Sequence, residues 1–121
     1  MVDFSKALHH LIPGGCHTYS RGDDQFPSNA PAILERGKGA YVWDPYGNQF
    51  LDYGMGLRSV TVGYDYDLIS KAAFNEVRNG NNLTRASLVE LRAAELLVDL
   101  IPGMDMVKFA KNGSTVTTAA V

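Results

Sequence analysis

The segment from residue 87 to residue 121 constrains the fold of this chain most. Its pattern predicts a helix over 87–101, a short strand over 106–109 and a second helix that opens at Thr115. A helix, a strand and a helix in this order are typical of a mixed or parallel α/β sheet. Such a sheet needs more strands than this chain supplies. We therefore expect an α/β chain that is truncated before its main sheet is complete.

Helix ends in the second half are marked clearly. Ser87 and Glu90 have the spacing of a capping box, in which each side chain bonds the backbone amide of the other residue. Pro102 ends that helix. An earlier helix is expected over 66–79, because its apolar residues recur at helical spacing and Gly80 follows at a capping position.

The first half has shorter elements. Apolar residues at helical spacing predict a lead-in helix over residues 4–12. Eight prolines and glycines between residues 13 and 39 exclude long regular elements there. Aromatic and β-branched residues between 41 and 53 then predict a hairpin, with Asp44-Pro45-Tyr46-Gly47 as a type I turn.

Composition narrows the class of protein. The chain has 121 residues, of which 45% are hydrophobic, and a net charge of −2. This balance gives no general attraction for nucleic acid or for a membrane surface. The first residues lack the pattern of a signal peptide, and the one cysteine excludes an internal disulfide. We expect a soluble, cytoplasmic protein. His9, His10, Cys16 and His17 lack the usual spacing of metal ligands, so no metal is expected.

The loop at Asn112-Gly113-Ser114 is a candidate phosphate site. The N-terminus of a helix exposes unpaired amides and a partial positive charge, which attract anions. Gly113 leaves room for close approach, and Ser114 adds a hydroxyl. The alternative is a strand-to-helix turn in which the hydroxyls only cap the helix.

Several segments together resemble a known family. "IPGG" near the start, then "GKGAYVWDPYGNQFLDYGMG", then the helix that ends in "IPGMDMVKFAKNGST" occur in the order and spacing of class III aminotransferases. The pattern is most similar to that of the glutamate-1-semialdehyde aminomutase group and its aminotransferase relatives. The resemblance covers residues 11–121.

This resemblance implies a fold, a cofactor and a reaction. It implies the N-terminal portion of an aminotransferase of fold type I that uses pyridoxal 5'-phosphate and works as a homodimer. Residues 1–65 would belong to the small domain and residues 66–121 to the start of the large, cofactor-binding domain. Asn112, Gly113 and Ser114 would hold the cofactor phosphate. The amino group would be moved on an amino acid, an amino aldehyde or a sugar-type substrate.

Two positions are implied in substrate binding. Arg21 falls where the aminomutase has an arginine that grips the substrate carboxylate, although pairing with Asp23 or Asp24 is an equal alternative. Leu57 falls where the aminomutase has an aromatic residue of the substrate pocket. Thr115 replaces an acidic residue of the family's phosphate loop. The Leu57 difference favours an aminotransferase of altered substrate over the aminomutase itself.

No catalytic residue is expected within this chain. Transamination needs a lysine that forms a Schiff base with the cofactor. In the family that lysine lies downstream of the phosphate loop, and Lys111, the nearest lysine here, fits a surface position better. The chain alone is therefore expected to be inactive and to self-associate through uncovered edges and apolar faces. The alternatives are a non-catalytic interaction or folding module and a phosphate-binding domain derived from the same fold.

Overall fold

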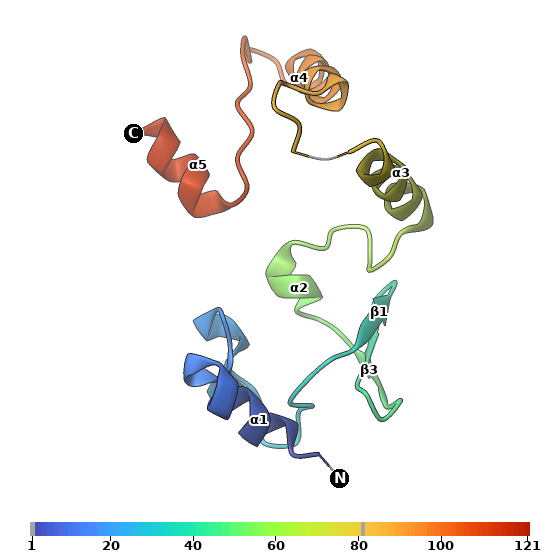
Figure 1. Ribbon diagram of the computed structural model, residues 1–121, viewed down its shortest axis with the longest axis vertical. Coiled ribbons are helices and arrows are strands. Elements are labelled where there is room, and N and C mark those ends of the chain that lie inside the picture. Colours follow the sequence, from blue (N-terminus) through green and yellow to red (C-terminus); the bar gives the residue numbers. More distant parts are fainter. Residues whose placement is uncertain (1, 81) are drawn as a thin grey trace. The chain divides into compact units, whose positions relative to one another are not determined.

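A computed structural model describes residues 2–80 and 82–121. The chain divides into two compact units, Met1–Asn75 and Glu76–Val121 (Figure 1). The elements in chain order are α1 (Phe4–Leu11), three short 3₁₀ turns (Pro13–Gly15, Tyr19–Arg21, Asp23–Gln25), β1 (Arg36–Lys38), β2 (Tyr41–Trp43), β3 (Gln49–Leu51), α2 (Met55–Arg58), α3 (Asp67–Arg78), α4 (Leu88–Leu100) and α5 (Gly113–Ala120).

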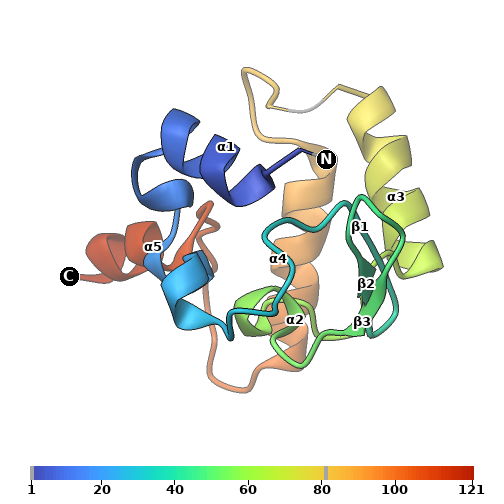
Figure 2. The same cartoon turned by 90° about the horizontal axis from the view of Figure 1, so that it is seen from below.

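The centre of the first unit is an antiparallel sheet in the order β1-β2-β3 (Figures 1 and 2). Val42 of β2 lies opposite Gly37 of β1 and Phe50 of β3. Only 5% of Val42 is exposed, and it is the buried apolar residue among those described. The β2–β3 hairpin confirms the sequence prediction. Strand β1 was not predicted, because glycine and charged residues make up its sequence.

The hairpin turn is built around the buried carboxylate of Asp44. Its Oδ1 accepts hydrogen bonds from the backbone N–H groups of Tyr46 and Asn48, both at 2.9 Å. Its Oδ2 accepts from the Asn48 side chain at 2.8 Å. The N–H of Gly47 donates to the Asp44 carbonyl at 3.1 Å, which is the bond that closes the predicted turn. The Asp44 side chain thus stabilises the turn by accepting from backbone N–H groups two and four residues later.

The sheet is tied to the start of α3 by polar contacts. Lys38 Nζ lies 2.9 Å from the Asp65 carboxylate and 2.6 Å from that of Asp67. Gly39 and Tyr64 exchange two backbone hydrogen bonds of 2.8 Å. The end of β1 is therefore linked to the residues that lead into α3. Helix α3 is within one residue of its predicted bounds at each end, and Gly80 follows it in the left-handed region at φ 92°.

The second unit has order that is mainly local. Ser87 and Glu90 form the predicted capping box: the Ser87 N–H donates to the Glu90 carboxylate at 2.6 Å, and the Glu90 N–H donates to Ser87 Oγ at 3.4 Å. Helix α4 ends at Leu100, as expected from the following Pro102. Within residues 76–80 and 82–121, no residue is fully buried.

The strand predicted over residues 106–109 is not formed. These residues form no helix or strand, and 88% of Met106 is exposed. A strand needs a neighbour to complete its hydrogen-bond ladder. The final helix also begins at Gly113, two residues earlier than predicted, because Asn112 rather than a later residue caps it. The observed fold is a small α/β arrangement with a three-stranded antiparallel sheet.

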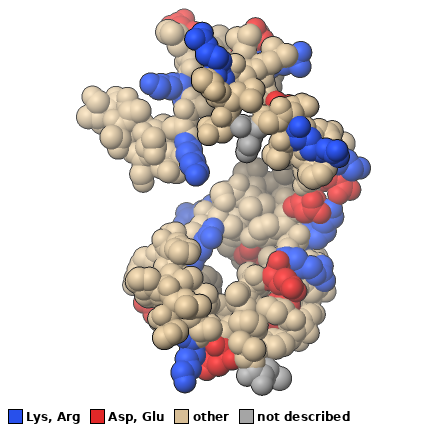
Figure 3. All heavy atoms as spheres, viewed as in Figure 1, with Lys and Arg blue, Asp and Glu red and all other residues tan. Residues whose placement is uncertain are grey.

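Charged side chains are spread out on the face in Figure 3, where acidic and basic groups are interspersed over areas of other residues. Among the helices formed by residues 2–80 and 82–121, none has the length and apolar character needed to cross a bilayer.

Candidate functional site

The N-terminus of α5 is the first part of the candidate site. Asn112 is the N-cap, and its Oδ1 accepts hydrogen bonds from Thr115 N–H at 2.9 Å and from Thr115 Oγ1 at 3.0 Å. The hydroxyls of Thr117 and Thr118 donate to helix carbonyls. Asn112 therefore caps the helix, whereas the hydroxyls of Thr117 and Thr118 bond carbonyls within it and do not cap its start.

Capping does not occupy every polar group of this helix start. The first amides of an α-helix, here those of Gly113 and Ser114, have no partner within the helix. Within residues 82–121 the Ser114 hydroxyl also makes no hydrogen bond to another residue. A methyl group added to Gly113 would meet no atom within 4 Å. The fold therefore does not itself require glycine here, and the open space next to free amides fits an anion such as a phosphate.

Arg21 lies in the 3₁₀ turn Tyr19–Arg21 of the first unit. The nearby Asp23 is already engaged by other side chains, since its Oδ2 lies 2.9 Å from His9 Nε2 and 3.1 Å from Ser5 Oγ. These bonds, from His9 first, lower the pKa of Asp23. No ion pair between Arg21 and Asp23 or Asp24 forms within residues 2–80.

Leu57 lies in α2, which has an uncommon backbone. Met55, Gly56, Leu57 and Arg58 have φ of 43°, 61°, 61° and 70°. The turn is therefore left-handed rather than a normal α-helical turn. L-residues are disfavoured in this region by about 1–2 kcal/mol each, and three of these four are not glycine. Strain of this kind persists only where neighbouring contacts hold it, and it is concentrated at functional sites.

Asp52 and Tyr64 supply the contacts that hold α2. Asp52 Oδ1 accepts from the N–H groups of Gly54 at 2.8 Å and Met55 at 3.0 Å, and Oδ2 accepts from the Tyr64 hydroxyl at 2.5 Å. Partial burial disfavours the Asp52 charge, but these hydrogen bonds outweigh it and lower the pKa of Asp52. Burial and donation to Asp52 raise the pKa of Tyr64. The pair therefore stays in its carboxylate and neutral hydroxyl forms near neutral pH.

Sequence inspection did not select Asp52 or Tyr64. The signal that could have found Asp52 is its position two residues before Gly54, which is typical of an aspartate that hydrogen-bonds its own backbone in a turn. Tyr64 carries no such signal, because its contact depends on a residue twelve positions away. The structure places Arg21 and Leu57 in the first unit and Asn112, Gly113 and Ser114 in the second.

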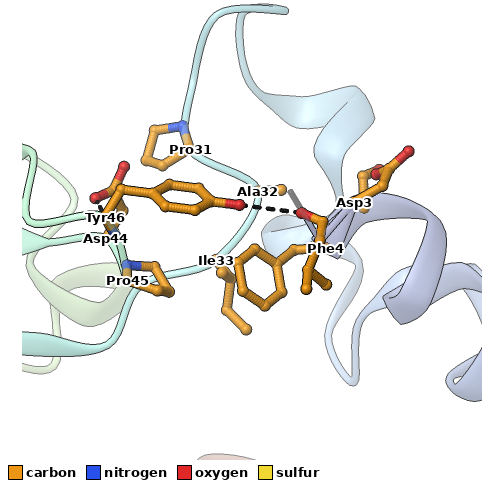
Figure 4. Close-up of a pocket in the computed structure, with 10 residues that line it drawn as sticks. Asp3, Phe4, Pro31, Ala32, Ile33, Asp44, Pro45 and Tyr46 are labelled. Atoms are coloured by element: carbon orange, nitrogen blue, oxygen red, sulfur yellow. Dashed lines mark hydrogen bonds between the residues drawn. The ribbon is translucent and has the colours of Figure 1, made fainter.

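A pocket in the first unit lies apart from these residues. It has a volume of about 180 Å³ and is lined by α1, the 31–33 segment and the hairpin turn (Figure 4). The Tyr46 hydroxyl donates across it to the Val2 carbonyl at 3.0 Å, and the rings of Phe4 and Tyr46 lie 5.8 Å apart. None of the predicted site residues lines it. We interpret the pocket as a packing crevice between α1 and the hairpin.

No metal centre is formed by the described part of the chain. Across residues 2–80 and 82–121, no three His, Cys, Asp or Glu side chains lie close enough to share a metal ion. His9 contacts Asp23 rather than Cys16 or His17.

Comparison with solved structures gives the fold a context. The internal aldimine form of the FumI protein from Sphingopyxis sp. MTA144, with pyridoxal phosphate, matches 98% of this chain at 28% identity and a TM-score of 0.89. A β-phenylalanine aminotransferase from Variovorax paradoxus matches 96% at 25% identity and a TM-score of 0.82. An omega-transaminase from Sphaerobacter thermophilus matches 98% at 23% identity and a TM-score of 0.84, which supports the fold alone.

The match covers only part of each of those proteins. This chain spans 28% of the FumI chain and 26% of each of the other two. No protein-family model matches it. The fold is thus that of one section of pyridoxal-phosphate-dependent transaminases.

Proposed function

We propose that this chain is the N-terminal part of a class III aminotransferase of fold type I that uses pyridoxal 5'-phosphate. The observation that carries the proposal is the likeness to FumI, which extends over 98% of the chain at 28% identity. The order of the segments "IPGG", "GKGAYVWDPYGNQFLDYGMG" and "IPGMDMVKFAKNGST" supports the class. Residues 1–65 would form part of the small domain and residues 66–121 the start of the large domain.

The α5 loop would hold the phosphate of the cofactor. The amides of Gly113 and Ser114 would donate to phosphate oxygens, and the Ser114 hydroxyl is free to add a further bond. Asn112 keeps its side-chain NH₂ for donation, because its oxygen already accepts from Thr115. The open space beside Gly113 supports this assignment.

Arg21 and Leu57 would contact the substrate. A guanidinium can bind a carboxylate through two parallel hydrogen bonds, and Arg21 is exposed and has no ion pair with Asp23 or Asp24 within residues 2–80. Leu57 would offer an apolar surface where the aminomutase group has an aromatic residue. This difference favours transfer of an amino group between substrates over the mutase reaction. The substrate class would be an amino acid, an amino aldehyde or a sugar-type compound.

The bound cofactor would act as the electron sink that allows an amino group to leave one carbon and join another. The residues present here would bind and orient its phosphate and the substrate. The Schiff-base lysine would lie outside residues 1–121, and a homodimer of the whole protein would complete each site. We propose a cytoplasmic location for it.

Borohydride reduction tests the proposal. In a longer protein that contains this sequence, pyridoxal phosphate followed by borohydride should give one stoichiometric adduct at a lysine outside residues 1–121, detected by mass spectrometry. The 121-residue chain alone should give no stoichiometric adduct at any defined lysine. A longer protein that stays colourless and unlabelled with this cofactor contradicts the proposal.

A pair of variants tests the phosphate loop separately. Ser114→Ala in the longer protein should weaken cofactor binding about tenfold, since a hydrogen bond to a charged group contributes roughly 1.5–3 kcal/mol. Thr118→Ala is the matched control, because the Thr118 hydroxyl already donates to the Ser114 carbonyl. Phosphate binding without a lysine adduct would instead favour a phosphate-binding domain.

A further inference from the structure

The left-handed turn α2 is the most constrained segment of the first unit outside the sheet. Its four residues follow one another in a backbone region that L-residues avoid. Backbone hydrogen bonds close it, from Arg58 N–H to the Gly54 carbonyl at 2.8 Å and from the N–H groups of Ser59 and Val60 to the Met55 carbonyl, the latter at 3.1 Å. These local bonds are available to a right-handed turn as well. They do not by themselves account for the left-handed form.

The contact that reaches α2 from outside the segment comes from Tyr64. Its hydroxyl donates to Asp52, and Asp52 accepts from the first amides of the turn. A methyl group added to Gly56 would lie 3.7 Å from the Tyr64 hydroxyl oxygen, which places the ring next to the middle of the turn. Tyr64 thus contacts α2 both directly and through the carboxylate.

Tyr64 is in turn fixed to the sheet. Its N–H and carbonyl both bond the backbone of Gly39 at 2.8 Å. Its ring lies on Gly37 of β1, where an added methyl group would come within 2.7 Å of the Tyr64 Cγ. The position of the Tyr64 hydroxyl is therefore set by the rigid part of the unit rather than by a mobile loop.

Burial and donation to Asp52 raise the pKa of Tyr64, and the charge of Arg21 opposes them as the smallest influence. Leu57 in α2 and Arg21 are the two residues assigned to the substrate in the proposed function. Tyr64 bonds Asp52, which in turn accepts from the first amides of the turn that carries Leu57.

We propose that Tyr64, acting through Asp52, is a positioning residue that sets substrate choice by holding α2 and hence Leu57 in place. The substrates concerned are amino compounds with a carboxylate, which Arg21 would bind while Leu57 limits the group beside it. This inference rests on the proposed function. It assigns to Tyr64 no contact with the cofactor or the reacting atoms.

The test uses the longer protein with its cofactor and the variant Tyr64→Phe, which removes only the hydroxyl. We expect the KM for the preferred carboxylate-bearing amino donor to rise about tenfold. The kcat should stay within about twofold of the parent, and the cofactor absorption spectrum should be unchanged. A raised KM with unchanged kcat corresponds to weaker binding of the substrate. The preference for this donor over an amine without a carboxylate should fall by a similar factor. Tyr53→Phe is the matched control, because the Tyr53 side chain is 90% exposed and should leave KM unchanged.

A second measurement follows the turn itself. Trypsin cleavage after Arg58 should become several-fold faster in Tyr64→Phe than in Tyr53→Phe, because the turn loosens when Asp52 loses a donor. An unchanged KM and donor preference in Tyr64→Phe overturn the inference, whether or not cleavage changes. A parent protein that fails to take up pyridoxal phosphate overturns the proposed function, and the inference with it. A parent that takes up the cofactor, with unchanged KM in the variant, overturns the inference alone.

Discussion

The two units of the chain differ in what holds them together. In the first unit, side chains connect elements that are distant in sequence: Lys38 bonds Asp65 and Asp67, and Tyr64 bonds Asp52. Among residues 82–121 of the second unit, the side-chain hydrogen bonds span at most four residues, as in the capping box of α4 and the N-cap of α5. The first unit has tertiary structure of its own, whereas the second has helices whose apolar residues stay exposed.

This difference bears on stability. Most of the stability of a helix in a protein comes from packing of its apolar face, because isolated helices of this length are marginal in water. Helices α4 and α5 have strong end signals but little packing. Their stability should therefore depend on whatever covers them. The stability of the sheet should instead depend on contacts within the first unit.

The largest effect expected is on association. Exposed leucines on α4 should make the 121-residue chain self-associate, and Leu88→Glu with Leu91→Glu should shift it strongly toward monomer in sedimentation velocity. As a control, Leu11→Glu with Tyr53→Gln changes exposed residues of the first unit and should shift association less. A parent chain that sediments as a clean monomer would contradict the prediction.

The sheet should lose stability when its buried residue, Val42, is replaced by a smaller one. Val42→Ala should lower the free energy of unfolding of the first unit by about 2 kcal/mol, as expected for removing buried methyl groups. Urea titration followed by fluorescence of Trp43, the one tryptophan, measures this. The same substitution at Val89, which is exposed on α4, should change the value by no more than about 0.5 kcal/mol. Equal losses at both positions would remove the contrast between the units.

Helix α4 of the second unit should lose stability when its N-terminal capping box is removed. Ser87→Ala removes a capping-box hydroxyl and should cost about 1 kcal/mol of helix stability, seen as lost helical signal in circular dichroism. Thr84→Ala, in the loop before α4, is the control and should have no effect on helical signal. Were both variants to leave helicity unchanged, α4 would be held by packing rather than by its end.

Acid should weaken the first unit through its hydrogen-bonded carboxylates. Burial raises the pKa of Asp44, whereas the hydrogen bonds from Asn48 and from backbone N–H groups lower it. The net pKa of Asp44 lies below the ordinary value of 3.8. The unfolded chain then binds the proton more readily. The stabilising contribution is full above pH 3.8 and is lost as the pH falls through the lower folded pKa.

Trp43 fluorescence across an acid titration measures this loss. Asp44→Asn keeps an acceptor but not the charge, so its unfolding should depend less steeply on pH than that of the parent. The conservative change Asp99→Asn on α4 should leave the slope unchanged, because the Asp99 side chain has no hydrogen bond within residues 82–121. An equally steep Asp44→Asn profile would mean that other groups carry the acid sensitivity.

Sequence patterns predicted the features that depend on near neighbours. The capping box at Ser87 and Glu90, the Asp44 turn and helices α1, α3 and α4 follow from spacing over a few residues, and each is confirmed. The left-handed α2 could not be predicted, because its contact with Tyr64, through Asp52, joins residues twelve positions apart. The strand expected over 106–109 was wrong, because apolar composition alone cannot supply a pairing partner.

The candidate site was predictable to a smaller degree. The loop at Asn112 was found because glycine and hydroxyl residues before a helix have a known anion chemistry. The roles of Arg21 and Leu57 came from family resemblance, and they remain predictions. Which substrate they select depends on side chains brought together in space, which local spacing does not encode.

The close contact between Gly37 and the Tyr64 ring has a practical consequence for protein engineering. Any larger side chain at position 37 must push that ring aside, since an added methyl group would already lie 2.7 Å from it. If Tyr64 positions Leu57 as we propose, a saturation library at this strand position should retune donor preference without altering a residue assigned to the substrate.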